Sequence, residues 1–506
     1  MQYQHVLKEV FGFNSLRHHQ VDVVESILAG SDTLAIIPTG GGKSLCYQLP
    51  GLVLDGVTLV ITPLIALMAD QVGALQKKGV IAEYLSHTKS NAEQNKAIKR
   101  VRNNTPSFLY LSPEKLATNA FQTQLTKLPI SLVVVDEAHC IAQWGDTFRP
   151  SYAQIANSLS RLKNRPPIIA VTATATPMVE TAITKSLQLQ HPSIFRHTAV
   201  RNNLYLEVVE CRSHSHKLFQ LLSIIVSHPR ETGIIYCATR KKTQQLSATL
   251  RTLLTEKDTT VEYFHAGRTN QEKELVMQQF LSNKVRVLTA TNAFGMGVDK
   301  PDVRYVVHFQ TPGSIEQYYQ EVGRAGRDGN PSICTVLYLK KDARIHHSFI
   351  SAIKDKQVQS KESKKHQQLH DLLHTKRCKT QVIRQYFSKE IAHPSCCLIC
   401  SSCRGSHPHT LQIQREIEHN KQQLNQIKCA LSQERGVPSE YVLPSLSLVF
   451  LALLQPRTKE VTRAVPALGT GWEKEWYNAV LAHREHKGEE YVNTDNTHPA
   501  YYYQAA

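Results

Sequence analysis

Short apolar runs separated by longer amphipathic stretches fill the first 340 residues of this 506-residue chain. The runs are rich in β-branched side chains, as buried parallel strands are, and the stretches between them are long enough for crossover helices. This alternation predicts an α/β protein with two doubly wound parallel-sheet domains. The expected strands are 33–37, 58–62, 108–111, 132–135 and 168–172 in the first domain, and 204–209, 233–236, 261–264, 285–288, 305–309 and 333–338 in the second.

Changes in this pattern define the expected domain organisation. The polar, Pro-containing segment 191–203 is typical of a linker, and the strand-like runs stop after residue 340. The last twenty residues have the composition of a weakly ordered tail. We therefore expect two α/β domains at 1–200 and 201–342, a helical region at 343–404, a small helical domain at 410–486 and a tail at 487–506.

Composition limits the classes of partner. With 41% hydrophobic and 20% charged residues the chain is globular rather than disordered, and no apolar run or N-terminal signal predicts a membrane span or secretion. The net charge of +17 favours a polyanionic binding partner. Nucleic acid is favoured over anionic lipid because the sequence shows no basic amphipathic helix. A basic protein without such a partner is the alternative. Residues 341–380 hold ten Lys and Arg against four Asp and Glu, which suggests a phosphate-contacting surface.

A glycine-rich segment, Pro38-Thr39-Gly40-Gly41-Gly42-Lys43-Ser44, follows the first predicted strand and precedes an expected helix. Its glycines let backbone N–H groups and the helix N-terminus approach a phosphate closely. In such a loop Lys43 reaches the β- and γ-phosphates of ATP and Ser44 binds Mg²⁺. The alternative is an ordinary glycine-rich turn.

Two adjacent carboxylates, Asp136 and Glu137, follow the predicted strand 132–135 and precede His139. The carboxyl ends of parallel strands meet at one edge of the sheet, so the pair is expected beside the phosphate loop. There Asp136 can hold Mg²⁺ through water, and Glu137 can orient or deprotonate the attacking water. A helix N-cap after a strand is the alternative explanation.

Arg324 and Arg327 belong to the second α/β domain, in the segment 317–329. Arginines three apart are expected to share one helical face, and a guanidinium suits the transition-state charge on a γ-phosphate. Together with a phosphate loop one domain away, they predict arginine fingers that act across a cleft. A solvated basic turn is the alternative.

Five of the eleven cysteines lie between residues 378 and 403. Cys397, Cys400 and Cys403 are spaced by three, and Cys378 lies in an expected helix, 376–387. Four thiolates form a closed, structural zinc site, while unpaired thiols or a redox pair are the alternatives. The predicted zinc ligands are Cys378, Cys397, Cys400 and Cys403, with Cys396 as an additional candidate.

In their order over residues 10–404 these motifs resemble the RecQ family of superfamily 2 helicases. Phe11-Gly12-Phe13, Arg17 and Gln20 resemble the family's adenine motif, which implies that Phe13 stacks on adenine while Arg17 and Gln20 bond to it. The resemblance implies RecA-like motor domains, with His139, Gln320 and Asp299 added to the ATP site. Further matching segments are 62–64 and 110–114 at the DNA backbone, 172–174 linking hydrolysis to domain movement, and 235–237, 264–267 and 290–299 in the second motor domain.

Three further parts of the chain resemble the family. Gln143–Pro150 resembles the family's aromatic-rich loop, which implies that Trp144, Phe148 and Arg149 contact single-stranded DNA. In this loop Asp146-Thr147 departs from the His-Asp that the family usually has. Simple packing of the aromatic side chains is the alternative. The cysteines resemble the family's zinc platform, which favours Cys397 over Cys396. Residues 413–486 resemble the helicase-and-RNase-D C-terminal domain, a family-specific bundle being the alternative, and no winged helix is expected.

The resulting prediction is an ATP-dependent 3′–5′ DNA helicase that moves on single strands and unwinds duplex or branched DNA in recombination, repair or replication. Its cofactors are ATP, Mg²⁺ and Zn²⁺. Expected partners are single-stranded and branched DNA and a single-strand-binding protein. We expect no association with a membrane and a monomeric enzyme. Its expected location is the nucleoid in a bacterium and the nucleus in a eukaryote. An ATP-driven RNA helicase, or a nucleic-acid-binding protein with an inactive motor, is the alternative.

Overall fold

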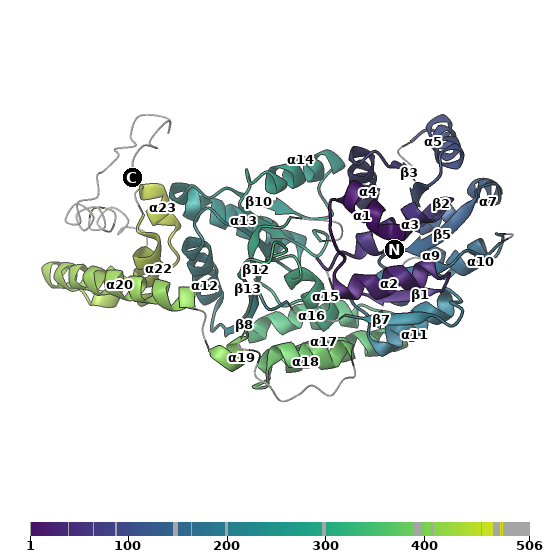
Figure 1. Ribbon diagram of the computed structural model, residues 1–506. Coiled ribbons are helices and arrows are strands. Elements are labelled where there is room, and N and C mark those ends of the chain that lie inside the picture. Colours follow the sequence, from purple (N-terminus) through teal and green to yellow (C-terminus); the bar gives the residue numbers. More distant parts are fainter. Residues whose placement is uncertain are drawn as a thin grey trace.

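In the computed structural model, two parallel sheets stand side by side, each covered by helices (Figure 1). The structure describes residues 2–38, 40–63, 65–86, 89–144, 150–162, 164–197, 201–295, 300–388, 397, 399–405, 408–456, 458–468, 476 and 478. No helix in these ranges has both the length and the apolar character needed to cross a bilayer.

The first sheet has seven parallel strands in the order β3-β4-β2-β5-β6-β1-β7. All five predicted strands are present, and β3 and β7 are additional. The strands are β1 Thr33–Ile36, β2 Val57–Ile61, β3 Ile81–Leu85, β4 Ser107–Leu111, β5 Ile130–Val135, β6 Ile168–Thr172 and β7 Ser193–Arg196.

Alternate residues of these strands enter two different hydrophobic cores. In β1, Leu34 and Ile36 face one core whereas Ala35 faces the other, and in β5 Val133 and Val134 are divided in the same way. A sheet buried on both faces in this manner is the doubly wound arrangement that the sequence predicts. The covering helices are α1 Gln2–Phe11, α2 His18–Leu28, α3 Lys43–Val53, α4 Ile65–Lys77, α5 Asn91–Asn103, α6 Pro113–Leu116, α7 Asn119–Leu125, α8 Cys140–Trp144, α9 Pro150–Ala153, α10 Ile155–Leu159 and α11 Pro177–Ser186.

The predicted linker 191–203 is not entirely a linker, because it contains β7. This strand pairs in parallel with β1, and Arg196 at its end donates to both carboxylate oxygens of Glu180 on α11, at 2.7 and 2.6 Å. Phe195 packs against one core of the domain. The short edge strand is partly exposed, so its residues are too polar to be recognised as a buried run.

The second sheet has six parallel strands in the order β10-β11-β9-β12-β13-β8, and every strand predicted for this domain is present. The strands are β8 Leu204–Glu210, β9 Thr232–Tyr236, β10 Val261–Phe264, β11 Val287–Ala290, β12 Val303–His308 and β13 Ser332–Tyr338. Its helices are α12 His214–Ser227, α13 Arg240–Leu254, the 3₁₀ turn η1 Thr255–Lys257, α14 Asn270–Leu281 and α15 Ile315–Val322.

The region after β13 is helical, as predicted, and packs directly on the second motor domain. Leu369, Ile383 and Phe387 enter the same hydrophobic core as Leu206 of β8 and Tyr318 of α15. The elements are the turn η2 Lys340–Asp342 and helices α16 Ala343–Ser351, α17 Lys356–His374, α18 Lys379–Phe387 and α19 Ser401–Arg404. Figure 1 shows α16 and α17 side by side along one edge of this domain.

The C-terminal helices also share a core with the second motor domain. Leu448, Phe450 and Leu451 belong to the same buried cluster as Leu222 of α12 and Leu250 of α13. The helices are α20 Pro408–Arg435, α21 Ser439–Val442, α22 Ser445–Leu454 and α23 Lys459–Ala464 (Figure 1). The structure therefore attaches the helical module to the motor by hydrophobic packing as well as by the chain.

Candidate ATPase site and cysteine cluster

The phosphate loop lies between β1 and α3, as the sequence predicts. Gly40 and Gly42 have φ angles of 80° and 79°, and Gly42 caps α3. A Cβ atom on Gly41 would lie 2.5 Å from Cγ2 of Ile37, and one on Gly42 would collide with the amide of Gln20. Close backbone approach therefore requires glycine here, which is what a phosphate-binding loop needs.

Residues of α2 and its N-cap hold this loop in place. Nη1 of Arg17 donates to the Gly40 carbonyl at 3.1 Å, and Nε2 of Gln20 donates to the carbonyls of Gly41 and Gly42 at 3.4 and 3.3 Å. The family resemblance places Arg17, Gln20 and Phe13 at adenine, which remains a prediction. Phe13 is 52% exposed, so its ring is available for stacking.

The carboxylate pair follows β5, and Asp136 is within electrostatic range of Lys43, the residue before Ser44. Burial and, to a smaller extent, the charge of Glu137 raise the pKa of Asp136 to about 7, although Lys43 opposes this shift. The Ser44 hydroxyl accepts a hydrogen bond from Gln71 at 3.0 Å. A cation would relieve the cost of a buried anion, and a carboxylate and a hydroxyl are the hard oxygen ligands that Mg²⁺ prefers. These residues therefore fit the Mg²⁺ that an ATPase requires.

A series of close polar contacts leads from this carboxylate pair to the second motor domain. Nδ1 of His139 lies 2.9 Å from Thr172 Oγ1 and 3.3 Å from Glu137 Oε2, while Nε2 of His139 lies 3.2 Å from Nε2 of Gln320. The same Gln320 nitrogen donates to Thr174 Oγ1 at 3.3 Å. Burial lowers the pKa of His139, so the ring is neutral at pH 7.

The tautomer of His139 follows from these partners. An amide nitrogen only donates, so Nε2 of His139 accepts from Gln320 and its proton is on Nδ1. Gln320 thus joins both the histidine that follows Glu137 and the threonine segment after β6. The sequence placed His139 and Gln320 in the ATP site, and the structure brings them together.

The two arginines lie in a turn and not on a helix. α15 ends at Val322 with Gly323 as its C-cap, and Gly326 has a φ of 55°. The expectation that Arg324 and Arg327 share a helical face is therefore wrong, because the glycines end the helix.

The turn nevertheless directs Arg327 toward the phosphate loop. A Cβ atom on Gly40 would lie 3.6 Å from Cγ of Arg327. Arg324 is buried beside Gly295, where a Cβ atom would lie 2.7 Å from Nη2 of the arginine.

Arg201 holds this turn, a role that no sequence pattern indicated. Its guanidinium donates to the carbonyls of Gly323 and Ala325, both at 2.7 Å, and of Gly326 at 3.0 Å. Its Nη1 would also lie 3.7 Å from a Cβ atom on Gly40, so it is adjacent to the phosphate loop. Its only sequence signal was a charged residue in a predicted linker.

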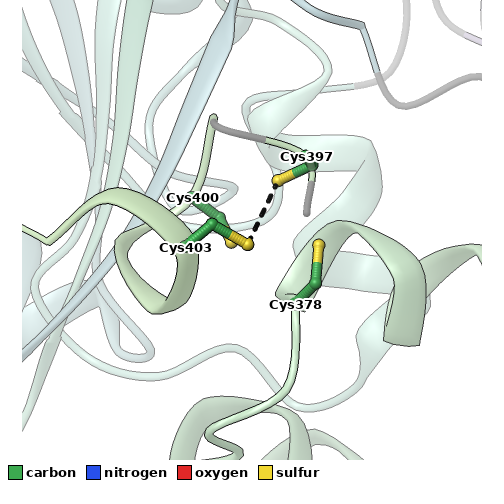
Figure 2. Close-up of side chains that lie close together, drawn as sticks. All are labelled: Cys378, Cys397, Cys400 and Cys403. Carbon is green, nitrogen blue, oxygen red and sulfur yellow. Dashed lines mark hydrogen bonds between the residues drawn. The ribbon is translucent and has the colours of Figure 1, made fainter. Parts of the chain in front are cut away.

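The four predicted cysteine ligands converge at the second motor domain (Figure 2). Their sulfur atoms all lie within 4.8 Å of one another, and the sulfurs of Cys397 and Cys403 are 3.9 Å apart. With Zn–S bonds of about 2.3 Å, a tetrahedral site has sulfur–sulfur edges of roughly 3.8 Å. Cys378 is the N-cap of α18, one residue before the helix that was predicted to contain it. The set fits a closed zinc site.

Some predicted site residues lie outside the described residues. They are Thr39 of the phosphate loop, Phe148 and Arg149 of the aromatic-rich loop, Asp299, and Cys396. The side chain of Trp144 is also outside them, although its backbone ends α8.

Comparisons with known proteins agree with this geometry. The DEAD/DEAH box helicase model matches residues 17–182, and the Helicase conserved C-terminal domain matches residues 215–329. The chain is 40% identical to a probable ATP-dependent DNA helicase RecS of Bacillus subtilis strain 168, covering 69% of each chain. It is 36% identical to the ATP-dependent DNA helicase RecQ of the same strain, over 81% of this chain and 69% of the relative.

Two other similarities cover different parts of the chain. A putative ATP-dependent RNA helicase, R290 of Acanthamoeba polyphaga mimivirus, is 34% identical over 94% of this chain and 85% of its own. The crystal structure of the DUF1998 helicase MrfA bound to DNA superimposes with a TM-score of 0.57 at 16% identity, over 69% of this chain and 53% of that one. The latter similarity establishes the fold alone.

Two parallel-sheet domains with an ATPase site between them define a helicase motor of superfamily 2. Within this class, the chain belongs to the RecQ family of ATP-dependent DNA helicases.

Proposed function

We propose that this chain hydrolyses ATP with Mg²⁺ to move 3′ to 5′ along single-stranded DNA and to unwind duplex or branched DNA in recombination and repair. One observation carries the proposal: residues of both motor domains meet at a single site. Gln320 of the second motor domain reaches His139 of the first, and Arg327 lies against Gly40 of the phosphate loop. A site completed from two domains makes hydrolysis depend on their relative position.

Each side chain in the site has a separate task. Lys43 and the N–H groups of the loop bind the β- and γ-phosphates, while Ser44 and Asp136 would hold Mg²⁺, which supplies charge neutralisation at the phosphates. Glu137 orients the attacking water and accepts its proton, with His139 beside its carboxylate at 3.3 Å. Arg327 and Arg324 stabilise the charge that develops on the γ-phosphate.

Domain movement follows from the same contacts. ATP bound between the domains attracts the arginines and favours closure. After hydrolysis this attraction is lost, the cleft opens, and the bound strand advances. The Gln320 bridge to His139 and Thr174 connects the hydrolytic carboxylate to the moving domain, in keeping with the role expected for residues 172–174.

For the cysteine cluster we propose a structural zinc ion bound by Cys378, Cys397, Cys400 and Cys403. Four thiolates leave no position for water, so the metal would support the fold rather than the chemistry. Cys400 is fully buried, and the backbone beside it pairs with β8 through the Leu206 N–H and the Ile399 carbonyl at 3.1 Å. The metal would thereby fix the helical platform to the motor.

The test is ATP-dependent displacement of a labelled strand from duplexes with a 3′ or a 5′ single-stranded tail. We expect displacement from the 3′-tailed duplex alone. We expect Lys43→Ala to abolish ATP hydrolysis and displacement while single-strand binding survives, because Lys43 contacts phosphate and not DNA. Undiminished hydrolysis in this variant, or displacement from the 5′ tail alone, would contradict the proposal.

RNA is the second candidate substrate, and the similarity to a protein named as a putative RNA helicase favours testing it. Stimulation of ATP hydrolysis is compared for single-stranded DNA and RNA of one sequence. We expect DNA to stimulate hydrolysis. Stimulation by RNA alone would assign the chain to RNA.

A further inference from the structure

A polar groove runs between α16 and α17, outside the ATPase site. Its volume is about 830 Å³. Lys356, Ser360, Ser363, Lys364 and Gln367 line it from α17 at helical spacing, so they share one face of that helix. At about 1.5 Å per residue, this row extends roughly 16 Å along the helix axis, which is long enough for several phosphates of an extended strand.

Hydrogen bonds between the two helices form the groove in advance. The amide nitrogen of Gln359 on α17 donates to the carbonyls of Ile350 and Ser351 at the end of α16, at 3.1 and 3.4 Å. The N-terminus of α17 is capped by Asp355, whose carboxylate accepts from the backbone of Gln357 and Val358. Both walls are therefore fixed without any ligand.

The chemistry of the groove matches a phosphate backbone. Its lining consists of two lysines, one histidine, four serine hydroxyls, two glutamine amides and one isoleucine, and none of the lining residues is acidic. Lys356 and Lys364 are exposed. Lysines and hydroxyls without a competing carboxylate are typical of sequence-independent phosphate contact.

The groove is next to the carboxyl edge of the second motor sheet. A smaller pocket of about 160 Å³ lies at the carboxyl ends of β9 and β12, lined by Gln310, Thr311 and Phe349 among others. Phe349 is 48% exposed and belongs to α16, between the groove residues Ser348 and Ile350. His346 fastens α16 to this edge through the Thr311 carbonyl, at 2.6 Å.

We propose that the α16–α17 groove binds the sugar-phosphate backbone of single-stranded DNA that continues from the carboxyl edge of the second motor sheet, with Phe349 stacking on a base at the crossing. This inference rests on the proposed function, because it extends the path of the same DNA strand. An exposed aromatic ring beside a basic groove is the arrangement that holds single strands without sequence preference.

The test uses the full chain and fluorescent single-stranded oligonucleotides of about 8 and about 25 nucleotides. The longer one exceeds the ~4–16 nucleotides that a single OB fold binds, so it can reach a second contact surface. Affinity for the long strand falls as salt rises, and we expect Lys356→Ala/Lys364→Ala to make this dependence shallower. The slope of log affinity against log salt should become less negative by roughly 1.4, at about 0.7 for each of two lost phosphate contacts. The short strand, which occupies the motor alone, should show no change. Phe349→Ala should weaken binding of the long strand by about 5- to 100-fold.

The matched control is Lys354→Ala/Lys361→Ala, which removes two exposed lysines of the same segment that do not line the groove. We expect it to change the salt slope less than the groove variant does. Thermal unfolding of all variants verifies that they are folded.

Three results would overturn the groove proposal. The groove variant and the wild type could have equal salt slopes, or the groove and control variants could show equal changes in salt slope. The third result is a loss of affinity for duplex DNA alone. Failure of the proposed function is distinguishable, because the wild-type chain itself would then show no ATP hydrolysis stimulated by single-stranded DNA.

Discussion

At the scale of single residues, Arg201 shows how the arginine turn is positioned. One guanidinium satisfies three backbone carbonyls around Arg324 and Arg327, and burial lowers the pKa of Arg201 without removing its charge. Asn203 adds hydrogen bonds to the carbonyls of Gly326 and Asn330, both at 2.8 Å. The turn therefore depends on two side chains that precede it by more than a hundred residues.

We predict that Arg201→Lys lowers kcat for ATP hydrolysis by about 10- to 100-fold, the range expected when a catalytic group is displaced by ~1 Å. A lysine cannot reproduce the planar fork that bonds several carbonyls. The KM for ATP should change little, because phosphate-loop contacts are retained. Steady-state hydrolysis with saturating single-stranded DNA measures both constants.

Arg102→Lys, on the exposed side of α5, is the control for this experiment. If Arg201→Lys raises KM and leaves kcat unchanged, Arg201 does not position the arginines.

Much of the ATPase site was predictable because its parts are contiguous. The loop at 38–44 and the pair Asp136 and Glu137 each lie within a few residues of sequence. Contacts between distant segments, such as those of Arg201 with residues 323–326, leave no local pattern. The helical expectation for Arg324 and Arg327 failed because periodicity alone does not show where Gly323 ends the helix.

At the scale of elements, the cysteine cluster joins two short helices and a strand. Cys378 is the N-cap of α18, Cys400 is the N-cap of α19 and Cys403 lies within it, while the backbone of Ile399 is bonded to β8. The four-residue helix α19 has no buried residue of its own. A metal bound at the cluster would hold this helix to α18 and β8 in place of hydrophobic packing.

We predict that removing the metal with a chelator, or the Cys400→Ser substitution, increases hydrogen exchange in α18, α19 and the adjoining end of β8. The loss of stability should be at least several kcal/mol, because structural zinc binds zinc-finger peptides with about 10–16 kcal/mol. Metal analysis should find zinc in the wild type and a reduced content in the variant. Cys429→Ser, at an exposed position on α20, is the control. Unchanged exchange in a metal-free chain would contradict a structural role.

Strand prediction succeeded for the buried strands and for both edges of the second sheet, and failed at the two edges of the first sheet. The central strands are fully buried and read as apolar runs. β3 and β7 lie at the two edges of the first sheet and are only partly buried, so polar residues interrupt their pattern. β7 was consequently included in a predicted linker.

At the scale of the whole molecule, the chain forms two bodies across the ATPase site. The second motor domain, the cysteine-bearing helices and the C-terminal helices are joined by shared hydrophobic cores. Phe450 of α22 packs edge-on against Phe219 of α12 with ring centroids 5.7 Å apart, and Trp476 donates to the Val442 carbonyl at 2.8 Å. The resemblance of residues 413–486 to a C-terminal domain did not predict this attachment. The hydrophobic core that the C-terminal helices share with the second motor domain is assembled from segments that are distant in the sequence.

We predict that Phe450→Ala destabilises the second motor domain as well as the C-terminal helices. The expected cost is about 3–5 kcal/mol, as for a fully buried phenylalanine. Chemical denaturation measures this loss, and hydrogen exchange in α12 should increase. Tyr441→Ala is the control, because Tyr441 is 76% exposed and its loss should cost less than about 0.5 kcal/mol. Normal protection of α12 in Phe450→Ala would show that the helices unfold independently.

Because α20 is attached to the second motor domain, a fluorescent label on α20 can report the movement of that domain during ATP hydrolysis. Cys429 is exposed on α20, whereas Cys46, Cys140, Cys211, Cys237 and Cys334 in the motor domains are buried. A dye attached to Cys429 would therefore move together with the second motor domain. Paired with a second dye at a cysteine introduced in place of Arg102, it would record by energy transfer each opening and closing of the cleft as ATP is consumed.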